Sequence, residues 1–386
     1  MYERGHIVNM LKIIGIVAGV IIVAVIAFFV IMQYYLSKED PNYVLKYIKE
    51  HKEDETCSLF IKRNGEVLTS INENKKLPLA SMAKIVIAVE FAKQVSEGKI
   101  SRDEQISLHE LEKYYVKDTD GGAHPNWLED AKARELVKNG QIALEEVAKG
   151  MIHYSSNANT TYLLDKLGIE RVNDSLKELE LTSHDKFSSY TASLYMRGYV
   201  EKELHEPENQ SLEMIRNMSK EEYNKHVLQI QEWMKDEEEW KKRDIPLKVD
   251  MEFQRIWSDR LVGANAKDYM SIMEKINSRK YFPKSMQEEI ENIFQGTVKN
   301  SKFEYAGQKG GSTAFVLTKS LYTRDRKGNK VEVVIMFNDI EDQVAYQKLR
   351  NNIDYFIRDI ITSEEFRKNY NRIILLCKQD VIKGRC

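Results

Sequence analysis

The chain has 386 residues, of which 58 are Lys or Arg and 60 are Asp or Glu, so its formal net charge is −2. With 42% hydrophobic and 31% charged residues, the composition excludes a disordered chain or a fibre and predicts one or two globular domains. The small net charge provides no basic field for a nucleic acid partner. The three cysteines, Cys57, Cys377 and Cys386, match no zinc spacing and are too few for a disulfide scaffold, so we expect unpaired thiols, with one bridge as the alternative.

The N-terminal region contains a long apolar segment. Residues 13–32 carry no charge and, as a helix, extend about 30 Å, which is the hydrocarbon thickness of a bilayer. Tyr34 and Tyr35 follow at the level of interfacial aromatic anchors, and the bulky residues there differ from a signal-peptide cleavage site. We therefore expect a short tail at 1–12, a transmembrane helix at 13–32 and a stalk at 33–52. A buried core helix is the alternative.

Strands are predicted on both sides of a long helical region. Residues 57–61 and 67–71 flank Asn64-Gly65, which is the strongest short signal for a β-hairpin. Near the other end, residues 314–318 and 331–337 are expected to form two more strands joined by a polar turn. Strands so far apart, with helices between them, predict an α/β fold with one sheet and an inserted helical subdomain.

The helical region has two unusual parts. The run after Ser81, up to about Val95, is apolar nearly all round, which is typical of a buried helix. Residues 201–250 instead contain 14 acidic and 9 basic residues, and Trp233 and Trp240 are spaced to share one helix face. We interpret this stretch as a solvated helical insertion; a partner-binding surface is the alternative.

The sequence Ser81-Met82-Ala83-Lys84 places a hydroxyl and an amine three residues apart. On a helix, residues i and i+3 share a face, which would put the Lys84 amine beside the Ser81 hydroxyl. A serine becomes nucleophilic when a neighbouring base removes its proton, and a buried lysine near positive charge has a lowered pKa that suits this task. The alternative, a capping serine and a surface lysine, fits poorly because the surrounding helix is too apolar.

Two polar motifs follow in the chain. Tyr154-Ser155-Ser156-Asn157 lies between two helical patterns, where Ser155 is placed to relay a proton and Asn157 to hold an amide; a plain turn is the alternative. Gln308-Lys309-Gly310-Gly311-Ser312-Thr313 precedes a predicted strand, and its glycines allow another backbone to approach the strand edge. Lys309 would supply charge for a carboxylate; an edge bulge with a solvent-exposed lysine is the alternative.

In this order, the three motifs resemble those of the penicillin-recognising serine enzymes, which include class A β-lactamases and DD-peptidases and carry S-x-x-K, S-D-N and K-T-G. The resemblance extends over about residues 53–362 and leaves a tail at 363–386. It implies an α/β fold with an antiparallel sheet subdomain, an all-helical subdomain and a cleft between the two. The helical subdomain would span about 101–263, including the charged insertion at about 201–255.

The resemblance also implies roles for individual residues. In chain order, the first three roles are the acylated nucleophile, its base and a proton relay. The next three are a group that binds the substrate amide, a cation that binds the substrate carboxylate, and a residue whose backbone N–H belongs to the oxyanion hole. The second N–H of the oxyanion hole is that of the nucleophile itself. The residues at these positions are Ser81, Lys84, Ser155, Asn157, Lys309 and Ser312.

Two positions depart from the family pattern. Ser156 stands where the family usually has Asp, a mainly structural position that tolerates the change. Gly310 stands where a hydroxyl residue normally helps to bind the carboxylate, so Ser312 or Thr313 would have to replace it.

The base for hydrolysis is a further difference. Class A β-lactamases activate water with a Glu in an E-x-x-L-N stretch, and residues 181–190 contain no such element. Glu206-Pro207-Glu208-Asn209 is a partial likeness that lacks the Leu-Asn ending, so Glu206 is the minority candidate for this base. Without a base the acyl-enzyme would be long-lived, which favours a penicillin-binding or peptidoglycan-processing role.

The sequence therefore predicts a serine enzyme that forms an acyl-enzyme with D-Ala-D-Ala-type peptidoglycan peptides or β-lactams. A class A β-lactamase and a non-catalytic cell-wall or β-lactam-binding ectodomain are the alternatives. Flanking charges do not fix the membrane orientation, but the resemblance implies a single-pass protein with an extracytoplasmic domain. No cofactor is expected, and no metal, because the loop from Asp118 to His124 lacks the closing carboxylate of a calcium loop.

The membrane anchor gives a direct test. Because residues 13–32 can span a bilayer and show no cleavage signal, the mature protein should keep its N-terminus and sediment with membranes. Fractionation followed by N-terminal peptide mass would check this. Recovery of a soluble form that begins after Met32 would contradict it.

Overall fold

The computed structural model describes residues 2–299 and 302–369 of the chain. The chain forms two compact units, one that joins Met1–Lys49 to Glu341–Cys386 and one that comprises Glu50–Ile340. All three sequence motifs belong to the larger unit, which therefore carries the candidate site.

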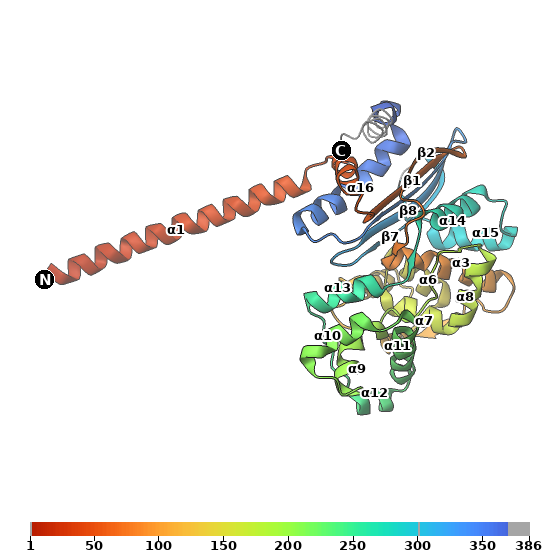
Figure 1. The fold of residues 1–386 in the computed structure, drawn as a ribbon, viewed down its shortest axis with the longest axis horizontal. Helices are drawn as coiled ribbons and strands as arrows, with labels where there is room; N and C mark the ends of the chain where they lie inside the picture. Colours follow the sequence, from red (N-terminus) through yellow and green to blue (C-terminus); the bar gives the residue numbers. More distant parts are fainter. Residues whose placement is uncertain (1, 300–301, 370–386) are drawn as a thin grey trace. The chain divides into compact units, whose positions relative to one another are not determined.

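The smaller unit is helical. It contains α1 (Tyr2–Ser37), most of α2 (Pro41–His51) and α16 (Gln343–Thr362). The helix α1 is continuous (Figure 1), and from Ile13 to Ser37 it is long and apolar enough to cross a membrane. None of its most apolar stretch is buried. The observed apolar helix therefore extends beyond the predicted end at residue 32.

The last helix is fixed to the N-terminal segment by side-chain amides. The Asp40 N–H donates to the side-chain oxygen of Asn352 at 2.6 Å, and the Asn351 amide donates to the Leu36 carbonyl at 2.9 Å. These bonds explain why α16 groups with the N-terminal segment, whereas the sequence analysis assigned it to a domain at 53–362. The predicted domain boundaries remain predictions.

The larger unit contains an antiparallel sheet of five strands in the order β2-β1-β9-β8-β7. The first strand, β1, lies between β2 and β9, so the sheet joins the two ends of this unit, as the sequence predicted. Cys57 in β1 is buried and forms no disulfide with another described residue, while Cys377 and Cys386 lie outside the described residues. The strands are β1 (Cys57–Arg63), β2 (Glu66–Ile71), β7 (Phe303–Ser312), β8 (Leu317–Asp325) and β9 (Lys330–Phe337).

The first hairpin forms where the sequence predicted it. Asn64 and Gly65 have φ angles of 52° and 85°, and Arg63 pairs with Glu66 across the turn. Two consecutive residues with positive φ match the twist of a two-residue hairpin, which explains the preference for Asn-Gly.

The third motif lies inside β7 rather than before a strand. Residues 314–316, predicted to begin a strand, form the connection to β8 instead. The Thr313 hydroxyl oxygen accepts the N–H groups of Phe315 and Val316 at 3.2 and 3.1 Å, which turns the chain at the end of β7. Because β7 is at the edge of the sheet, only one side of the motif pairs with another strand, and the Gln308 N–H on this strand donates to the Thr297 hydroxyl at 3.1 Å.

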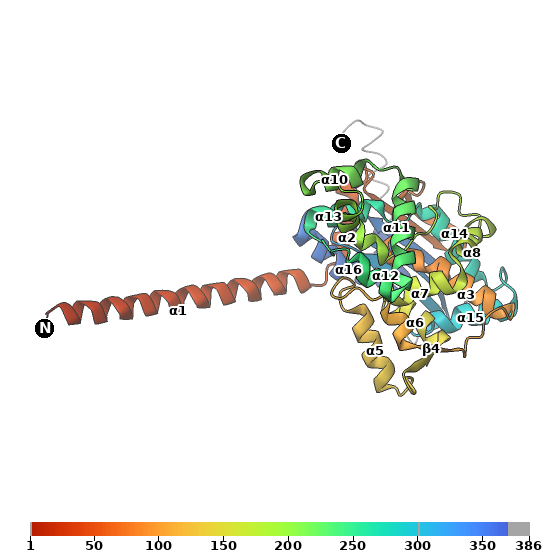
Figure 2. The same cartoon turned by 90° about the horizontal axis from the view of Figure 1, so that it is seen from below.

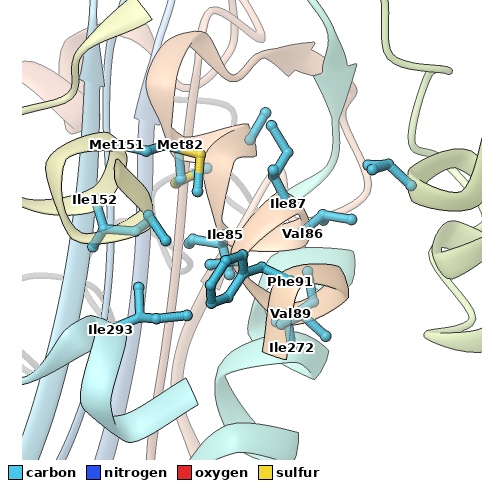
Figure 3. Close-up of a cluster of buried hydrophobic side chains, with 14 of the residues drawn as sticks. Met82, Ile85, Val86, Ile87, Val89, Phe91, Met151, Ile152, Ile272 and Ile293 are labelled. Atoms are coloured by element: carbon cyan, nitrogen blue, oxygen red, sulfur yellow. The ribbon is translucent and has the colours of Figure 1, made fainter. Parts of the chain in front are cut away.

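The helix α3 (Lys84–Ser96) forms the centre of the main core. Figure 3 shows its apolar side chains meeting Met151 and Ile152 of α6 (Leu144–His153). Side chains of α14 (Ala266–Ser278) and α15 (Lys284–Phe294) close the cluster, and α14 also packs on β8 and β9. The all-round apolar pattern of α3 therefore reflects burial on every side.

Shorter elements complete the helical part. Two short ladders pair β3 with β6 and β4 with β5. Their bounds, with those of the remaining helices before the insertion, are β3 (Leu77–Pro78), the 3-10 helix η1 (Ala80–Ala83), β4 (Gln105–Ser107), α4 (Leu108–Glu112), α5 (Ala123–Ala133), β5 (Gln141–Ala143), α7 (Asn157–Leu167), α8 (Ile169–Glu178) and β6 (Gly263–Ala264).

The charged insertion is a group of helices with a hydrophobic core of its own. Figures 1 and 2 both show these helices lying together. The prediction that Trp233 and Trp240 share one helix face is wrong. Asp236 accepts the N–H groups of Glu238 and Glu239 and so begins a new helix, which contains Trp240 but not Trp233. The helices are η2 (Ala192–Tyr195), α9 (Met196–Lys202), α10 (Glu208–Asn217), α11 (Lys220–Lys235), α12 (Glu237–Arg243) and α13 (Met251–Arg260).

The insertion is closed at its base by Asp185 and Gly263. The Asp185 N–H donates to the Gly263 carbonyl, and the Gly263 N–H donates to the Asp185 carboxylate, each at 2.9 Å. Lys76 and Lys220 form ion pairs with the same carboxylate. The segment between residues 185 and 263 therefore begins and ends at neighbouring positions of the fold.

Candidate active site

Ser81 lies on a strained turn that leads into α3. Ala80, which precedes it, has a φ of 46°, an uncommon backbone conformation for a residue with a Cβ. The turn is held through Leu79, whose N–H donates to the Val262 carbonyl at 2.9 Å and whose carbonyl accepts the Thr318 hydroxyl at 2.8 Å. The half-buried Ser81 is thus fixed at the N-terminal end of a buried helix.

The Lys84 amine is completely buried and bonded to the second motif. Its Nζ donates to the Ser155 carbonyl at 2.7 Å and to the Asn157 side-chain oxygen at 2.8 Å, and it lies 3.4 Å from the Ser155 hydroxyl. No hydrogen bond joins Lys84 to the Ser81 hydroxyl among the described residues, so the predicted direct contact is absent. Catalytic hydrogen bonds in ligand-free proteins often tighten only when substrate binds.

Ser155 lies between two lysines. The Lys309 Nζ, in a side chain that is 5% exposed, donates to the Ser155 hydroxyl at 3.0 Å, and the Lys84 Nζ lies 3.4 Å from the same hydroxyl. Ser155 has a φ of 70°, which is a left-handed conformation that costs energy for serine. This strained turn directs both the carbonyl and the hydroxyl of Ser155 to Lys84. The same hydroxyl also accepts from Lys309.

The two lysines have different electrostatic states. Burial lowers the pKa of Lys84 well below its usual value and the charge of Lys309 lowers it further, while attraction by Asp120 partly opposes them. Burial, helped by Lys319, lowers the pKa of Lys309 to about 7. A neutral amine is a proton acceptor and an ammonium binds carboxylates, so the pair can provide both functions near neutral pH.

Gly311 allows the edge strand to lie directly against Ser81. A Cβ at this position would be 2.5 Å from the Ser81 nitrogen and 2.6 Å from the Leu79 carbonyl oxygen. Any side chain here would therefore push β7 away from the nucleophile turn. The close approach puts Gly311, the residue before Ser312, against the Ser81 nitrogen, and the oxyanion role of the Ser81 and Ser312 N–H groups stays a prediction.

The missing hydroxyl at Gly310 has one candidate replacement. Alternate residues of a strand share a face, so Ser312 lies on the same face as Gly310. Ser312 is exposed. The Thr313 hydroxyl oxygen instead accepts hydrogen bonds from the Ser258 hydroxyl at 2.8 Å and from two N–H groups of the following turn. Of the two, Ser312 is therefore free to meet a substrate.

Ser156 performs the structural task of the Asp that it replaces. Its hydroxyl accepts the N–H of Asn159 at 3.1 Å and caps α7, a position where Ser and Asp are equally suitable. The same hydroxyl meets Nδ1 of the buried His124 at 3.0 Å. The departure at this position therefore leaves the turn intact.

An aromatic ring also lies against the Lys84 amine. The ring centroid of Tyr190 lies 5.2 Å from the Lys84 Nζ, and this residue was not assigned from the sequence because no local motif marks so distant a contact. Glu206 lies in the turn between α9 and α10, and it is not among the partners of Lys84. The structure thus joins Lys84, Ser155, Asn157 and Lys309 by hydrogen bonds, with Ser81 and Ser312 on the turn and strand that meet at Gly311. Among the described residues, Glu206 forms no hydrogen bond to Lys84, and its role stays a prediction.

A family model described as the Beta-lactamase enzyme family matches residues 42–314. The chain belongs to this family. A class A β-lactamase structure from Bacteroides cellulosilyticus DSM 14838 is 14% identical, covers 85% of this chain and 100% of its own, and has a TM-score of 0.52. The β-lactamase structure from Sphaerobacter thermophilus DSM 20745 is also 14% identical, covers 83% and 97%, and has a TM-score of 0.52.

These findings confirm the predicted family and fold. The larger unit is a β-lactamase-like serine enzyme domain, with its antiparallel sheet and its helical part. At such low identity the solved structures establish the fold alone. The roles of individual residues depend on the contacts within this chain.

The lysine pair predicts a specific pH dependence. The second-order rate constant for acylation reports the free protein, and it should fall as the pH rises through about 7, because Lys309 then loses the charge that binds the carboxylate. Lys309→Arg should keep its charge and abolish this alkaline decline. A stopped-flow pH profile with benzylpenicillin would check both. A wild-type rate constant that stays flat from neutral to alkaline pH would contradict the assignment.

Proposed function

We propose that this protein is a membrane-anchored serine acyltransferase or hydrolase. Ser81 forms an acyl-enzyme with D-Ala-D-Ala-type peptidoglycan peptides or β-lactams, and the domain works on the extracytoplasmic side. The observation that carries the proposal is the placement of Ser155 between the buried amines of Lys84 and Lys309, beside the nucleophile turn. The apolar helix from Ile13 to Ser37 supports the anchor.

The proposed acylation uses Lys84 as its base. The neutral Lys84 amine accepts the Ser81 proton while the Ser81 oxygen attacks the substrate carbonyl carbon. The N–H groups of Ser81 and Ser312 stabilise the oxyanion, a contribution of about 10²–10³-fold in rate for one donor. The Ser155 hydroxyl gives its proton to the departing nitrogen and takes one from the Lys84 ammonium, 3.4 Å away.

Substrate binding uses the remaining groups. Lys309 supplies the charge for the substrate carboxylate, and Ser312 supplies the hydroxyl that Gly310 lacks. The Asn157 side-chain oxygen is held by Lys84 at 2.8 Å, which orients its amide nitrogen as a donor to the substrate carbonyl. This division supports a substrate that carries both an amide and a terminal carboxylate.

Slow deacylation is the second part of the proposal. Hydrolysis requires a base that deprotonates water next to the ester, and its loss costs about 10²–10⁴-fold. Among the described residues, Lys84 has hydrogen bonds to Ser155 and Asn157 and a ring contact with Tyr190, with no carboxylate bonded to it. This arrangement favours a penicillin-binding or peptidoglycan-processing enzyme. A fast β-lactamase is the second candidate, and the family match favours it.

The lifetime of the penicillin adduct separates these candidates. The full-length protein in detergent should gain one covalent benzylpenicillin on Ser81 that persists for minutes or longer, because no carboxylate among the described residues is hydrogen-bonded to Lys84. Intact-protein mass spectrometry over time would measure it. Ser81→Ala should remain unmodified, while Glu206→Gln, outside the site, should keep the persistent adduct.

Two other outcomes would change the proposal. Several turnovers per second would replace it with the β-lactamase function, and if Glu206→Gln then stopped them, Glu206 would be the base. No adduct with benzylpenicillin or with a D-Ala-D-Ala peptide ester would contradict acyl transfer and support a non-catalytic binding domain.

A further inference from the structure

Tyr190 contacts the Lys84 amine in addition to the second motif. Its side chain is 6% exposed, and its ring lies against the amine. Its hydroxyl is buried and has no hydrogen-bond partner among the described residues. Burial raises the pKa of this phenol, so the group stays protonated and does not act as a base.

The space around Tyr190 is almost filled. A cavity next to Ala80, the residue before the nucleophile, is walled by Tyr190 and by Tyr223 and Trp257 of the insertion. Its free volume is about 10 Å³, which is close to the minimum for one water molecule. The ring therefore has little room to move away from Lys84 while the insertion is in place.

A chain of two hydrogen bonds connects the insertion to Tyr190. The indole N–H of Trp257, in α13, donates to the Ser193 hydroxyl at 2.9 Å. The Ser193 hydroxyl then donates to the Tyr190 carbonyl at 3.0 Å. The insertion thus holds the backbone that carries the ring, although its helices have a separate hydrophobic core.

We propose that Tyr190, positioned by Trp257 through Ser193, controls the fate of the acyl-enzyme by keeping water away from the Lys84 amine. The charged insertion, which the sequence left without a role, is then the support of this shield. The inference rests on the proposed function, because it concerns the ester formed on Ser81.

The reaction that the ring suppresses is simple hydrolysis. With the ring removed, a water molecule can lie beside the neutral Lys84 amine, which accepts one of its protons. The water oxygen bonds to the ester carbon, the bond from that carbon to the Ser81 oxygen breaks, and the same proton passes from Lys84 to Ser81. No other reactant is needed.

The test measures deacylation and acylation separately. Tyr190→Ala should raise the deacylation rate constant of the benzylpenicillin adduct at least about 10-fold, the low end of the range for general-base catalysis. Trp257→Phe keeps an aromatic ring but removes the indole donor, so it should raise the ratio of deacylation to acylation about fivefold, the equivalent of one neutral hydrogen bond. Intact-protein mass gives the first rate and stopped-flow fluorescence the second.

Trp240→Phe is the matched control. Trp240 belongs to the same insertion and packs edge-on against Tyr195, outside the chain of bonds to Tyr190. In Trp240→Phe the ratio of deacylation to acylation should therefore change less than about twofold. A general loss of stability would slow acylation without raising the deacylation rate constant, so the rise in Trp257→Phe must appear in that rate constant itself.

The outcomes separate this inference from the proposed function. If the wild-type adduct forms and persists, but Tyr190→Ala and Trp257→Phe leave its lifetime unchanged, the inference is wrong and the proposed function stands. Because Trp257→Phe is a mild change, it decides the matter even if Tyr190→Ala does not fold. If the wild-type protein forms no adduct, both are wrong.

Discussion

The site depends on one constraint: the amine of Lys84 is buried among dipoles rather than opposite a bonded carboxylate. A carboxylate in hydrogen-bond contact would hold the lysine as an ammonium, which cannot accept the Ser81 proton. The Ser155 carbonyl and the Asn157 side-chain oxygen give the amine hydrogen bonds without a full negative charge. The charge of the second lysine, which is bonded to Ser155, also opposes protonation of Lys84.

The fold maintains this constraint at some cost in backbone energy. Ala80 and Ser155 both have left-handed backbones, which cost of order 1–3 kcal/mol each and persist only where surrounding structure imposes them. Here the surroundings are the buried helix α3, the ladder to β6 through Leu79, and the edge strand that Gly311 allows to approach. A rigid core thus holds the two serines while the edge of β7 stays available to substrate.

Local chemistry explains which features the sequence could predict. Asn64-Gly65 specifies a hairpin by its φ preferences, and the all-round apolar run after Ser81 specifies a buried helix, so both appear in the structure. The six predicted site residues were found through short motifs, each fixed by one turn or strand. The motif around Lys309 was placed before a strand rather than in β7, because its glycines weaken the local strand signal.

One wrong prediction came from an overlooked local cap, and the other features depend on distant contacts. Trp233 and Trp240 have helical spacing, but the Asp236 cap separates them onto two helices. The Tyr190 ring reaches Lys84 through a fold that joins residues more than a hundred positions apart in sequence. Likewise, α16 is held by Asp40 and Leu36, and no periodicity records those partners.

The protonation state of Lys84 is the most direct test of this account. With ¹⁵N-labelled lysine, the Nζ resonance of Lys84, assigned by its absence in Lys84→Met, can be followed as the pH is raised. The account predicts that it loses its proton well below the pH at which exposed lysines titrate, which is about 10.4, and at still lower pH in Asp120→Asn. Titration of Lys84 together with the exposed lysines would contradict the account.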